Sequence, residues 1–299
     1  MKKACFLRML FYVLCLSLAA CQKMITDEID KDEDTNNPKA VLFNISQFEQ
    51  IPFDQTIASR GTDVSSVCNH ISLALYQNGV KVKQVNQTTS DSDFGHLKVV
   101  VPEGVYKIVV IAHSCPKNPT MTNPEKIYFD GKVTDTFYYS DDLKLTDGAS
   151  HNLTLKRAVA MFRLVISDPI PSNVALMHFY YTGGSSTFDA LNGVGCVNSR
   201  QTETREVTED MRGKSGVFEV YTFPRSDSNT LKMQVTAHDG SNNMVARKSF
   251  EDVKVVRNMI TQYKGSFFGG EPEEGGIGNG SVQLNFYSEE EWTKNEFIY

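Results

Sequence analysis

The sequence lacks the long apolar run that a membrane-spanning helix requires. Its N-terminal apolar stretch, Met9 to Ala20, is uncharged but shorter than the about 20 residues that cross a bilayer core. A basic start, Met1-Lys2-Lys3 with Arg8 close behind, precedes this stretch. The combination is typical of a secretory signal, so we interpret residues 1–20 as a signal peptide and disfavour a permanent transmembrane anchor.

The signal ends in Leu18-Ala19-Ala20-Cys21, which is typical of a lipobox. A plain secretory signal beside a chance cysteine is the alternative. We predict cleavage before Cys21 and lipid attachment to its thiol, because several lipid chains on one residue give stable membrane anchoring. Residues 21–39 are rich in Asp and Glu and poor in apolar residues, which predicts a solvated tether.

The mature chain also lacks a cluster of Lys and Arg. Removing Lys2, Lys3 and Arg8 with the signal takes the formal net charge from −6 to −9. An acidic body without a basic patch argues against a nucleic-acid partner, and against binding an anionic membrane by charge.

Cysteine is scarce once the signal is removed. Cys5 and Cys15 leave with it and Cys21 is assigned to lipid, so Cys68, Cys115 and Cys196 remain. Export permits a disulfide, and Cys68 and Cys115 lie in the same half of the chain. Sequence alone leaves two alternatives open, a Cys68–Cys115 bond or three buried thiols that behave as small hydrophobes.

Motifs of catalysis are missing as well. There is no G-x-S-x-G elbow and no Walker loop, and the six histidines show no pair at zinc spacing. The Gly276–Gly280 stretch does not make a phosphate-binding loop. We therefore predict a protein that is not an enzyme and needs no cofactor or metal.

What the sequence does contain is a series of short β-type segments without a convincing long amphipathic helix. Asn78-Gly79 between two such segments is a strong hairpin signal. Many short strands at regular spacing predict a sandwich or barrel. The segments predicted as strands are 41–45, 71–76, 81–85, 97–101, 105–112, 151–155, 158–166, 175–181, 217–223, 231–237, 253–256 and 262–268.

The chain length and a fresh start near Arg157 predict two β-sandwich domains, residues 40–155 and 156–270. A Gly/Glu-rich linker and a C-terminal strand follow in residues 271–299. In that strand Val282, Leu284 and Phe286 alternate with polar residues. The strand could pair with an open sheet edge of another molecule, or fold back on its own second domain.

Several of these pieces together resemble one known family. They are the lipobox, the acidic tether, Pro102–Tyr106 ahead of a central strand, Arg157–Phe162, and Val256–Gly265 before Phe267-Phe268. The sequence resembles the fimbrillin-associated anchor subunits of Bacteroidetes, the minor-fimbrium anchoring type within the fimbrillin superfamily.

The resemblance implies two tandem transthyretin-like β-sandwich domains in an outer-membrane lipoprotein that anchors or caps surface fimbriae. It implies subunits joined to fimbrillin-like partners by strand exchange, with Val282, Leu284 and Phe286 as the candidate donor strand. Shaft fimbrillins of the superfamily are cut after an arginine, which makes Arg60 a candidate processing site. An uncleaved loop arginine is favoured, because an anchor is expected to keep its first strand.

Two other functions remain open from the sequence. A surface carbohydrate-binding lipoprotein would need exposed aromatic platforms, for which Tyr138-Tyr139 and Tyr180-Tyr181 are candidates, since the single Trp292 lies in the tail. Adjacent strand residues face opposite ways, so at least one tyrosine of each pair is expected in the core. A fimbrial tip adhesin would share the fold and differ by its distal position.

Overall fold

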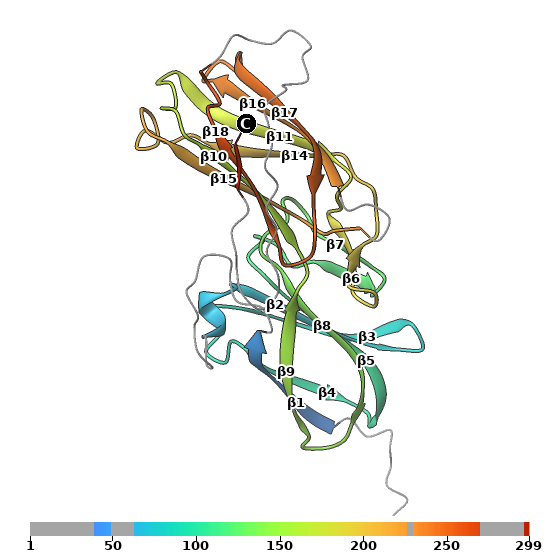
Figure 1. Ribbon diagram of the computed structural model, residues 1–299. Helices are drawn as coiled ribbons and strands as arrows, with labels where there is room; N and C mark the ends of the chain where they lie inside the picture. Colours follow the sequence, from blue (N-terminus) through green and yellow to red (C-terminus); the bar gives the residue numbers. More distant parts are fainter. Residues whose placement is uncertain (1–38, 49–62, 226–229, 270–295, 299) are drawn as a thin grey trace, which may run out of the picture. The chain divides into compact units, whose positions relative to one another are not determined.

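The computed structural model describes residues 39–48, 63–225, 230–269 and 296–298. These residues form an almost entirely β structure with one short 3-10 helix, η1 (Val64–Ser66), so the prediction of an all-β protein is confirmed (Figure 1). The strands in chain order are β1 (Lys39–Phe48), β2 (His70–Gln77), β3 (Val80–Thr88), β4 (His96–Val101), β5 (Gly104–His113), β6 (Thr120–Asn123), β7 (Lys126–Tyr128), β8 (Phe137–Leu145), β9 (Ser150–Arg157), β10 (Ala160–Ile166), β11 (Val174–Thr182), β12 (Thr187–Asp189), β13 (Val194–Gly195), β14 (Gln201–Glu206), β15 (Gly216–Thr222), β16 (Thr230–Asp239), β17 (Met244–Lys254), β18 (Ile260–Gly265) and β19 (Glu296–Ile298).

The first half of the chain builds a sheet with the order β3-β2-β5-β8-β9-β1-β4. Strand β8 pairs with β5 along its whole length but with β9 only at Phe137↔Arg157 and Tyr138↔Lys156. On the other side of that junction, β1 lies between β4, which is antiparallel, and β9, which is parallel. Apolar residues at alternate positions, such as Val41 and Phe43 of β1, enter one buried cluster with β2 and β5 residues.

The second half repeats this strand order. Strand β10 lies between antiparallel β15 and parallel β18, as β1 lies between β4 and β9. The order β14-β11-β16-β17 likewise matches β3-β2-β5-β8. The two halves therefore have the same sandwich topology, in agreement with the expected pair of tandem sandwiches, although the sequence shows only a weak similarity between them.

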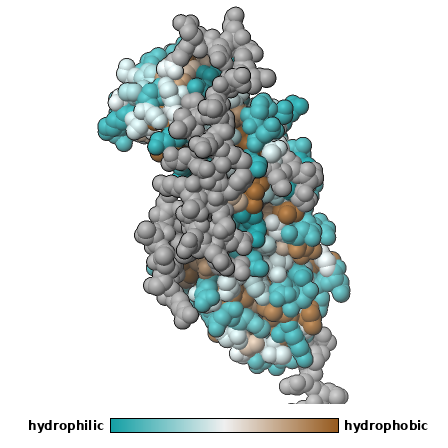
Figure 2. Space-filling view, in the orientation of Figure 1, coloured by the Kyte–Doolittle hydropathy of each residue, from teal (hydrophilic) through white to brown (hydrophobic). Residues whose placement is uncertain are grey.

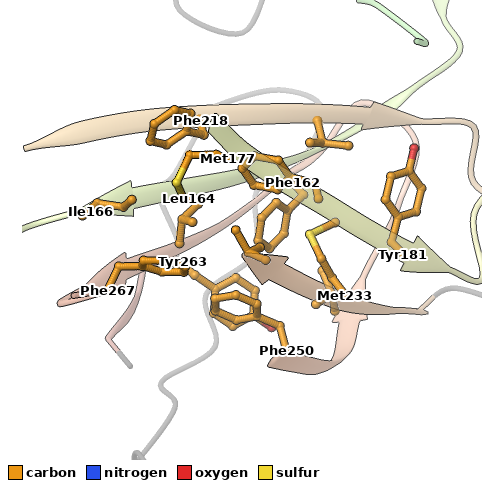
Figure 3. Close-up of a cluster of buried hydrophobic side chains, with 14 of the residues drawn as sticks. Phe162, Leu164, Ile166, Met177, Tyr181, Phe218, Met233, Phe250, Tyr263 and Phe267 are labelled. Carbon is orange, nitrogen blue, oxygen red and sulfur yellow. The ribbon is translucent and has the colours of Figure 1, made fainter. Parts of the chain in front are cut away.

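The core of the second sandwich is rich in aromatic rings (Figure 3). Phe162 of β10 lies within 5.6 Å of the rings of both Phe250 and Tyr263, measured between centroids. Its ring also meets Phe179 of β11 edge-on at 6.4 Å. These contacts join β10 and β18 of one sheet to β11 and β17 of the other, so Phe162 connects both layers.

A fourth, small sheet with the order β13-β12-β7-β6 takes strands from both sides of the predicted boundary at residues 155 and 156. Strands β7 and β12 pair at Thr187↔Tyr128 and Phe188↔Ile127. Beneath it lies a third apolar cluster, in which Val109 of β5 and Phe223 after β15 both take part. The two halves are thus joined by a shared sheet and a shared core.

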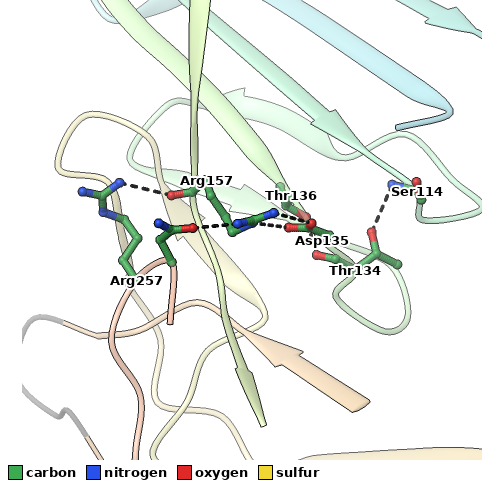
Figure 4. A network of polar contacts seen from close by, with 7 residues as sticks. Ser114, Thr134, Asp135, Thr136, Arg157 and Arg257 are labelled. Carbon is green, nitrogen blue, oxygen red and sulfur yellow. Dashed lines mark hydrogen bonds and ion pairs between the residues drawn. The ribbon is translucent and has the colours of Figure 1, made fainter. Parts of the chain in front are cut away.

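Arg157, at the end of β9, adds a polar link at this junction (Figure 4). Its side chain is fully buried, and its Nε and Nη2 donate to the two carboxylate oxygens of Asp135 at 2.8 and 3.0 Å. Its Nη1 donates to Asn258 Oδ1 at 2.6 Å, and its guanidinium lies 4.8 Å from the centre of the Phe137 ring. A buried arginine is tolerated because it is paired and hydrogen-bonded, so Arg157 ties the 257–259 turn to the first half.

The turns follow local sequence rules. Asn78 and Gly79 have φ angles of 53° and 78°, the left-handed pair that a two-residue hairpin turn requires, so the hairpin prediction is confirmed. The predicted separate strand at 253–256 was wrong, because Val253 and Lys254 end the long strand β17. Asp252 in that strand has φ 51°, and the pairing of β17 with β16 shifts by a bulge at this point. The bulge interrupts the alternation of apolar and polar residues along β17, so the sequence pattern does not show one continuous strand.

Candidate functional site

The sequence-predicted sites fall mostly outside the described part of the chain. Cys21, Arg60 and the donor-strand residues Val282, Leu284 and Phe286 all lie there. Further toward the C-terminus, β19 (Glu296–Ile298) pairs in parallel with β18 of the same chain. The registered pairs are Gln262↔Glu296, Tyr263↔Phe297 and Lys264↔Ile298, so a C-terminal strand does add to the second sandwich.

Cys68 and Cys115 are free thiols in the structure, so the candidate disulfide is not formed. Cys68 packs in the first core, with its thiol directed to the Val64 carbonyl. Cys115 packs in the third cluster, on the opposite face of β2 and β5. The sheet separates the two sulfur atoms, and the alternative of buried thiols describes both. Cys196, in contrast, is exposed.

The histidines form two pairs that their spacing in the sequence did not reveal. His70 and His113 stack with ring centroids 5.2 Å apart, and His178 and His238 meet edge-on at 4.6 Å. The members of each pair come from neighbouring strands far apart in the chain. Among the described residues, no group of three or more His, Cys, Asp or Glu side chains is placed to hold a metal ion.

His113 is fully buried at the end of β5. Its Nδ1 accepts a hydrogen bond from the Cys115 backbone N–H at 3.0 Å, while its Nε2 has no hydrogen-bond partner in the described part of the protein. Burial, and secondarily the neighbouring His70, lower the pKa of His113 to about 4. The ring is therefore neutral at physiological pH and acts as a structural core residue.

One cleft opens between the edge strands β14 and β15 and the 132–134 segment. Its volume is about 360 Å³, at the small end for ligand pockets. Lys132 and Glu206 are among its polar lining residues, while Met211 and Phe218 supply apolar surface.

A chain of buried polar groups lies beside this cleft. Tyr181 donates to the Glu203 carboxylate at 3.0 Å, and Arg205 donates to the same carboxylate at 2.7 Å. Arg205 also donates to the Glu219 carbonyl of β15 at 2.7 Å, which joins the two sheets at their open edge. Burial raises the pKa of Glu203, and the Arg205 guanidinium opposes that shift.

This network is not visible in the sequence, because residues 202–206 are polar at every position and are typical of a solvated strand. Both carboxylates of the network have a partner. Glu203 accepts from the Tyr181 hydroxyl, and Glu219 pairs with the Arg163 guanidinium at 2.7 Å. The arrangement stabilises the edge of the sandwich, and it offers no unengaged carboxylate beside a nucleophile.

Of the four tyrosines considered as sugar platforms, three are partly or wholly buried. Tyr181 is in the second core, Tyr138 packs edge-on against Phe188, and Tyr139 packs against the first core. Tyr180 remains 40% exposed. Trp292 lies outside the described residues.

The described surface in the view of Figure 2 is largely hydrophilic, with smaller hydrophobic areas among the polar residues. Among the described residues, no helix is long and apolar enough to cross a bilayer.

Comparison with known proteins gives a family without an assigned activity. Residues 47–297 match the model of a family of unknown function (DUF6562), and the chain belongs to that family. No curated protein matches the sequence.

Several solved structures are similar to this one. A candidate polysaccharide-binding protein from Bacteroides thetaiotaomicron has a TM-score of 0.47 at 8% identity, over 76% of this chain and 90% of the other. A candidate adhesin from Bacteroides ovatus has a TM-score of 0.46 at 12% identity, over 72% and 82%. The fimbrial anchor protein Mfa2 from Porphyromonas gingivalis has a TM-score of 0.37 at 11% identity, over 71% and 82%. At these identities and scores, none of them assigns a role to this chain.

Proposed function

We propose that the protein is an outer-membrane lipoprotein, held by lipid on Cys21, that serves as an anchor or accessory subunit of a fimbria. In this proposal it joins fimbrillin-like subunits by strand exchange through its C-terminal segment. The observation that carries the proposal is the pairing of β19 with β18, because it places the end of the chain on a sheet edge.

The geometry of this edge favours exchange. Strand β19 pairs with three of the six residues of β18, so few hydrogen bonds hold it. Each such bond contributes about 0.5–1.5 kcal/mol net. A longer strand from a neighbouring subunit could pair along more of β18 and would displace β19 at low cost, while the freed C-terminal segment would be available to a partner.

Strand β1 behaves differently, and this supports an anchor role. It lies in the interior of its sheet, and Val41, Phe43 and Ile45 are buried in the first core. Loss of β1 after cleavage at Arg60 would expose all three side chains. We therefore propose that Arg60 stays uncleaved and that β1 keeps the folded body attached to the lipidated Cys21.

Deletion of residues 270–299 tests the exchange. We expect the shortened protein to fold, with little change in melting temperature, and to lose co-purification with its fimbrial partner. Deletion of 271–280 alone is the matched control, since it shortens the glycine-rich segment and keeps the strand. Unfolding of the second sandwich in the 270–299 deletion would show that the segment is required intramolecularly and would contradict the proposal.

Cys21→Ala tests the anchor. Tagged wild-type protein should co-isolate a fimbrillin-like polymer with the outer membrane, and the variant should release that polymer into the medium. Co-isolation of a transporter and glycan-binding proteins, with no polymer, would instead favour a nutrient-uptake lipoprotein.

A further inference from the structure

The outer surface of the sheet β14-β11-β16-β17 carries an unusual set of side chains on its two central strands. Opposite the core residues, β11 presents Leu176, His178 and Tyr180, and β16 presents Gln234, Thr236 and His238. The register Tyr180↔Gln234, His178↔Thr236 and Leu176↔His238 places them in three rows. We call these six residues the polar face.

Tyr180 is the exposed aromatic residue of the polar face. It lies on a central strand, between Thr202 of β14 and Gln234 of β16, and is 40% exposed. An aromatic ring supplies a large rigid apolar surface with a polar tip. The C–H bonds on one face of a sugar ring pack against such a ring, while the sugar hydroxyls need donors and acceptors beside it.

Those donors and acceptors are already oriented. His178 Nδ1 lies 2.9 Å from Thr204 Oγ1. His238 uses both ring nitrogens within the protein, Nε2 with Thr236 Oγ1 at 3.0 Å and Nδ1 with the Asn242 carbonyl at 3.1 Å, so it holds its neighbours in place. The two histidine rings contact each other edge-on, which restrains both. Side chains held in this way lose little conformational freedom on binding, which favours affinity for a weakly interacting ligand.

The charge of the polar face selects among ligand classes. None of its six side chains is a carboxylate, an ammonium or a guanidinium. The formal charges next to its rows are Glu206 and Arg247 on the flanking strands and Lys232, two residues before Gln234 on β16, which is paired with Glu251 at 3.1 Å. Nucleic acids or acidic polymers require clustered cations, which this face lacks. A protein partner would favour a mostly apolar patch centre, whereas hydroxyl, amide and imidazole groups dominate here.

We propose that the polar face binds an uncharged carbohydrate chain, with Tyr180 as the stacking platform and His178, Gln234 and Thr236 as hydrogen-bonding groups. Three rows along the strands provide contacts for consecutive sugar rings. This activity is separate from strand exchange, since β18 and β19 belong to the other sheet of the sandwich.

Binding to a printed array of neutral glucans, mannans, xylans, galactans and fucosylated oligosaccharides tests the proposal, with polygalacturonate as the acidic probe. The Cys21→Ala full chain is used so that the protein is free of lipid. We expect binding to at least one neutral glycan, and a loss of affinity of roughly tenfold or more in Tyr180→Ala. Tyr180→Phe, which keeps the aromatic ring, should retain most of the affinity of the parent protein for that glycan.

Tyr128→Ala is the matched control, because Tyr128 is exposed to a similar extent, 46%, on the small sheet. It should bind as the parent does, and all three variants should keep the parental melting temperature. Absence of binding to every neutral glycan, binding to polygalacturonate alone, or equal binding by Tyr180→Ala would each overturn the proposal. Deletion of 270–299 should leave glycan binding intact, which separates this result from failure of the anchor proposal.

Discussion

The two sandwiches have the same strand order and differ in how the sheet continues beyond the last strand. In the first, β9 is flanked by β1 and continues into β8 through two residue pairs, so both of its neighbours come from its own half of the chain. In the second, β18 is flanked by β10 and by β19, a short strand from the distant C-terminus. One topology thus borders β9 with strands of its own half and borders β18 on one side with the short β19 alone, so the exchange we propose is expected only at the second half.

The largest effects should come from equivalent core positions in the two first strands. Phe43 of β1 and Phe162 of β10 each lie in the interior of a three-strand arrangement and are fully buried. Phe→Ala at either position should cost about 3–5 kcal/mol. Calorimetry of both variants shows whether the halves unfold independently. A separate transition shifted in each variant would indicate independence, whereas one shared transition would show that the small sheet couples them.

Arg157→Met should reveal how strongly the polar link joins the halves. The substitution removes the buried partner of Asp135 and Asn258, and breaking such a pair costs about 3–5 kcal/mol; Asp135 is partly exposed, which favours the lower end. The double variant with Asp135→Asn should recover part of this loss, because no carboxylate is then left unpaired. Chemical denaturation of the set measures the coupling, and equal stabilities of single and double variants would contradict it.

Acid should weaken the first half through His113. Its folded pKa of about 4 lies below the unfolded value of 6.5, so the unfolded chain binds a proton that the folded chain does not. Stability is complete above pH 6.5, falls by up to about 1.4 kcal/mol per pH unit between 6.5 and 4, and then levels off. In His113→Asn, which keeps an oxygen for the Cys115 N–H, this part of the slope should vanish from urea titrations. A slope unchanged by the substitution would exclude His113 as its source.

A smaller effect, confined to the second half, is expected at Asp168. Its carboxylate accepts backbone N–H groups of Phe267, Phe268 and Gly269 and the Ser266 hydroxyl, which fixes the chain just after β18. These bonds hold its pKa below the usual value despite the opposing effect of burial. Asp168→Ala should cost about 1.5–3 kcal/mol, measured by thermal unfolding. An unchanged melting temperature would contradict the stabilising role of this carboxylate.

Strands with clear alternation were predictable from the sequence. The alternating segment 231–237 lies within β16. The apolar run 105–112 lies within β5, where consecutive residues on both faces of the strand are buried. Strand β8 was missed because Asp141 and Asp142 interrupt its pattern, yet Asp142 lies in the strand and pairs with Lys107 at 2.8 Å. Short strands such as β12 were missed because three residues are too few to show a period.

The polar face could likewise be predicted only in part from the sequence. Tyr180 was recognised as a candidate platform, and the rule that adjacent residues face opposite ways places Tyr181 in the core. The sequence could not predict that His178 and His238 lie near Tyr180 on one surface, because their proximity depends on the pairing of β11 with β16.

By itself, the sequence determined the properties that depend on local order along the chain: the hairpin at Asn78-Gly79 and an all-β composition. The signal peptide and lipid attachment at Cys21 stay predictions of the same local kind. Tertiary structure alone decided which distant strands became neighbours. It separated Cys68 from Cys115 by a sheet, buried Arg157 against Asp135 and Asn258, and aligned Tyr180 with two histidines. The physical reason is that strand register is set by packing and hydrogen bonding between segments whose separation in the chain carries no periodic signal.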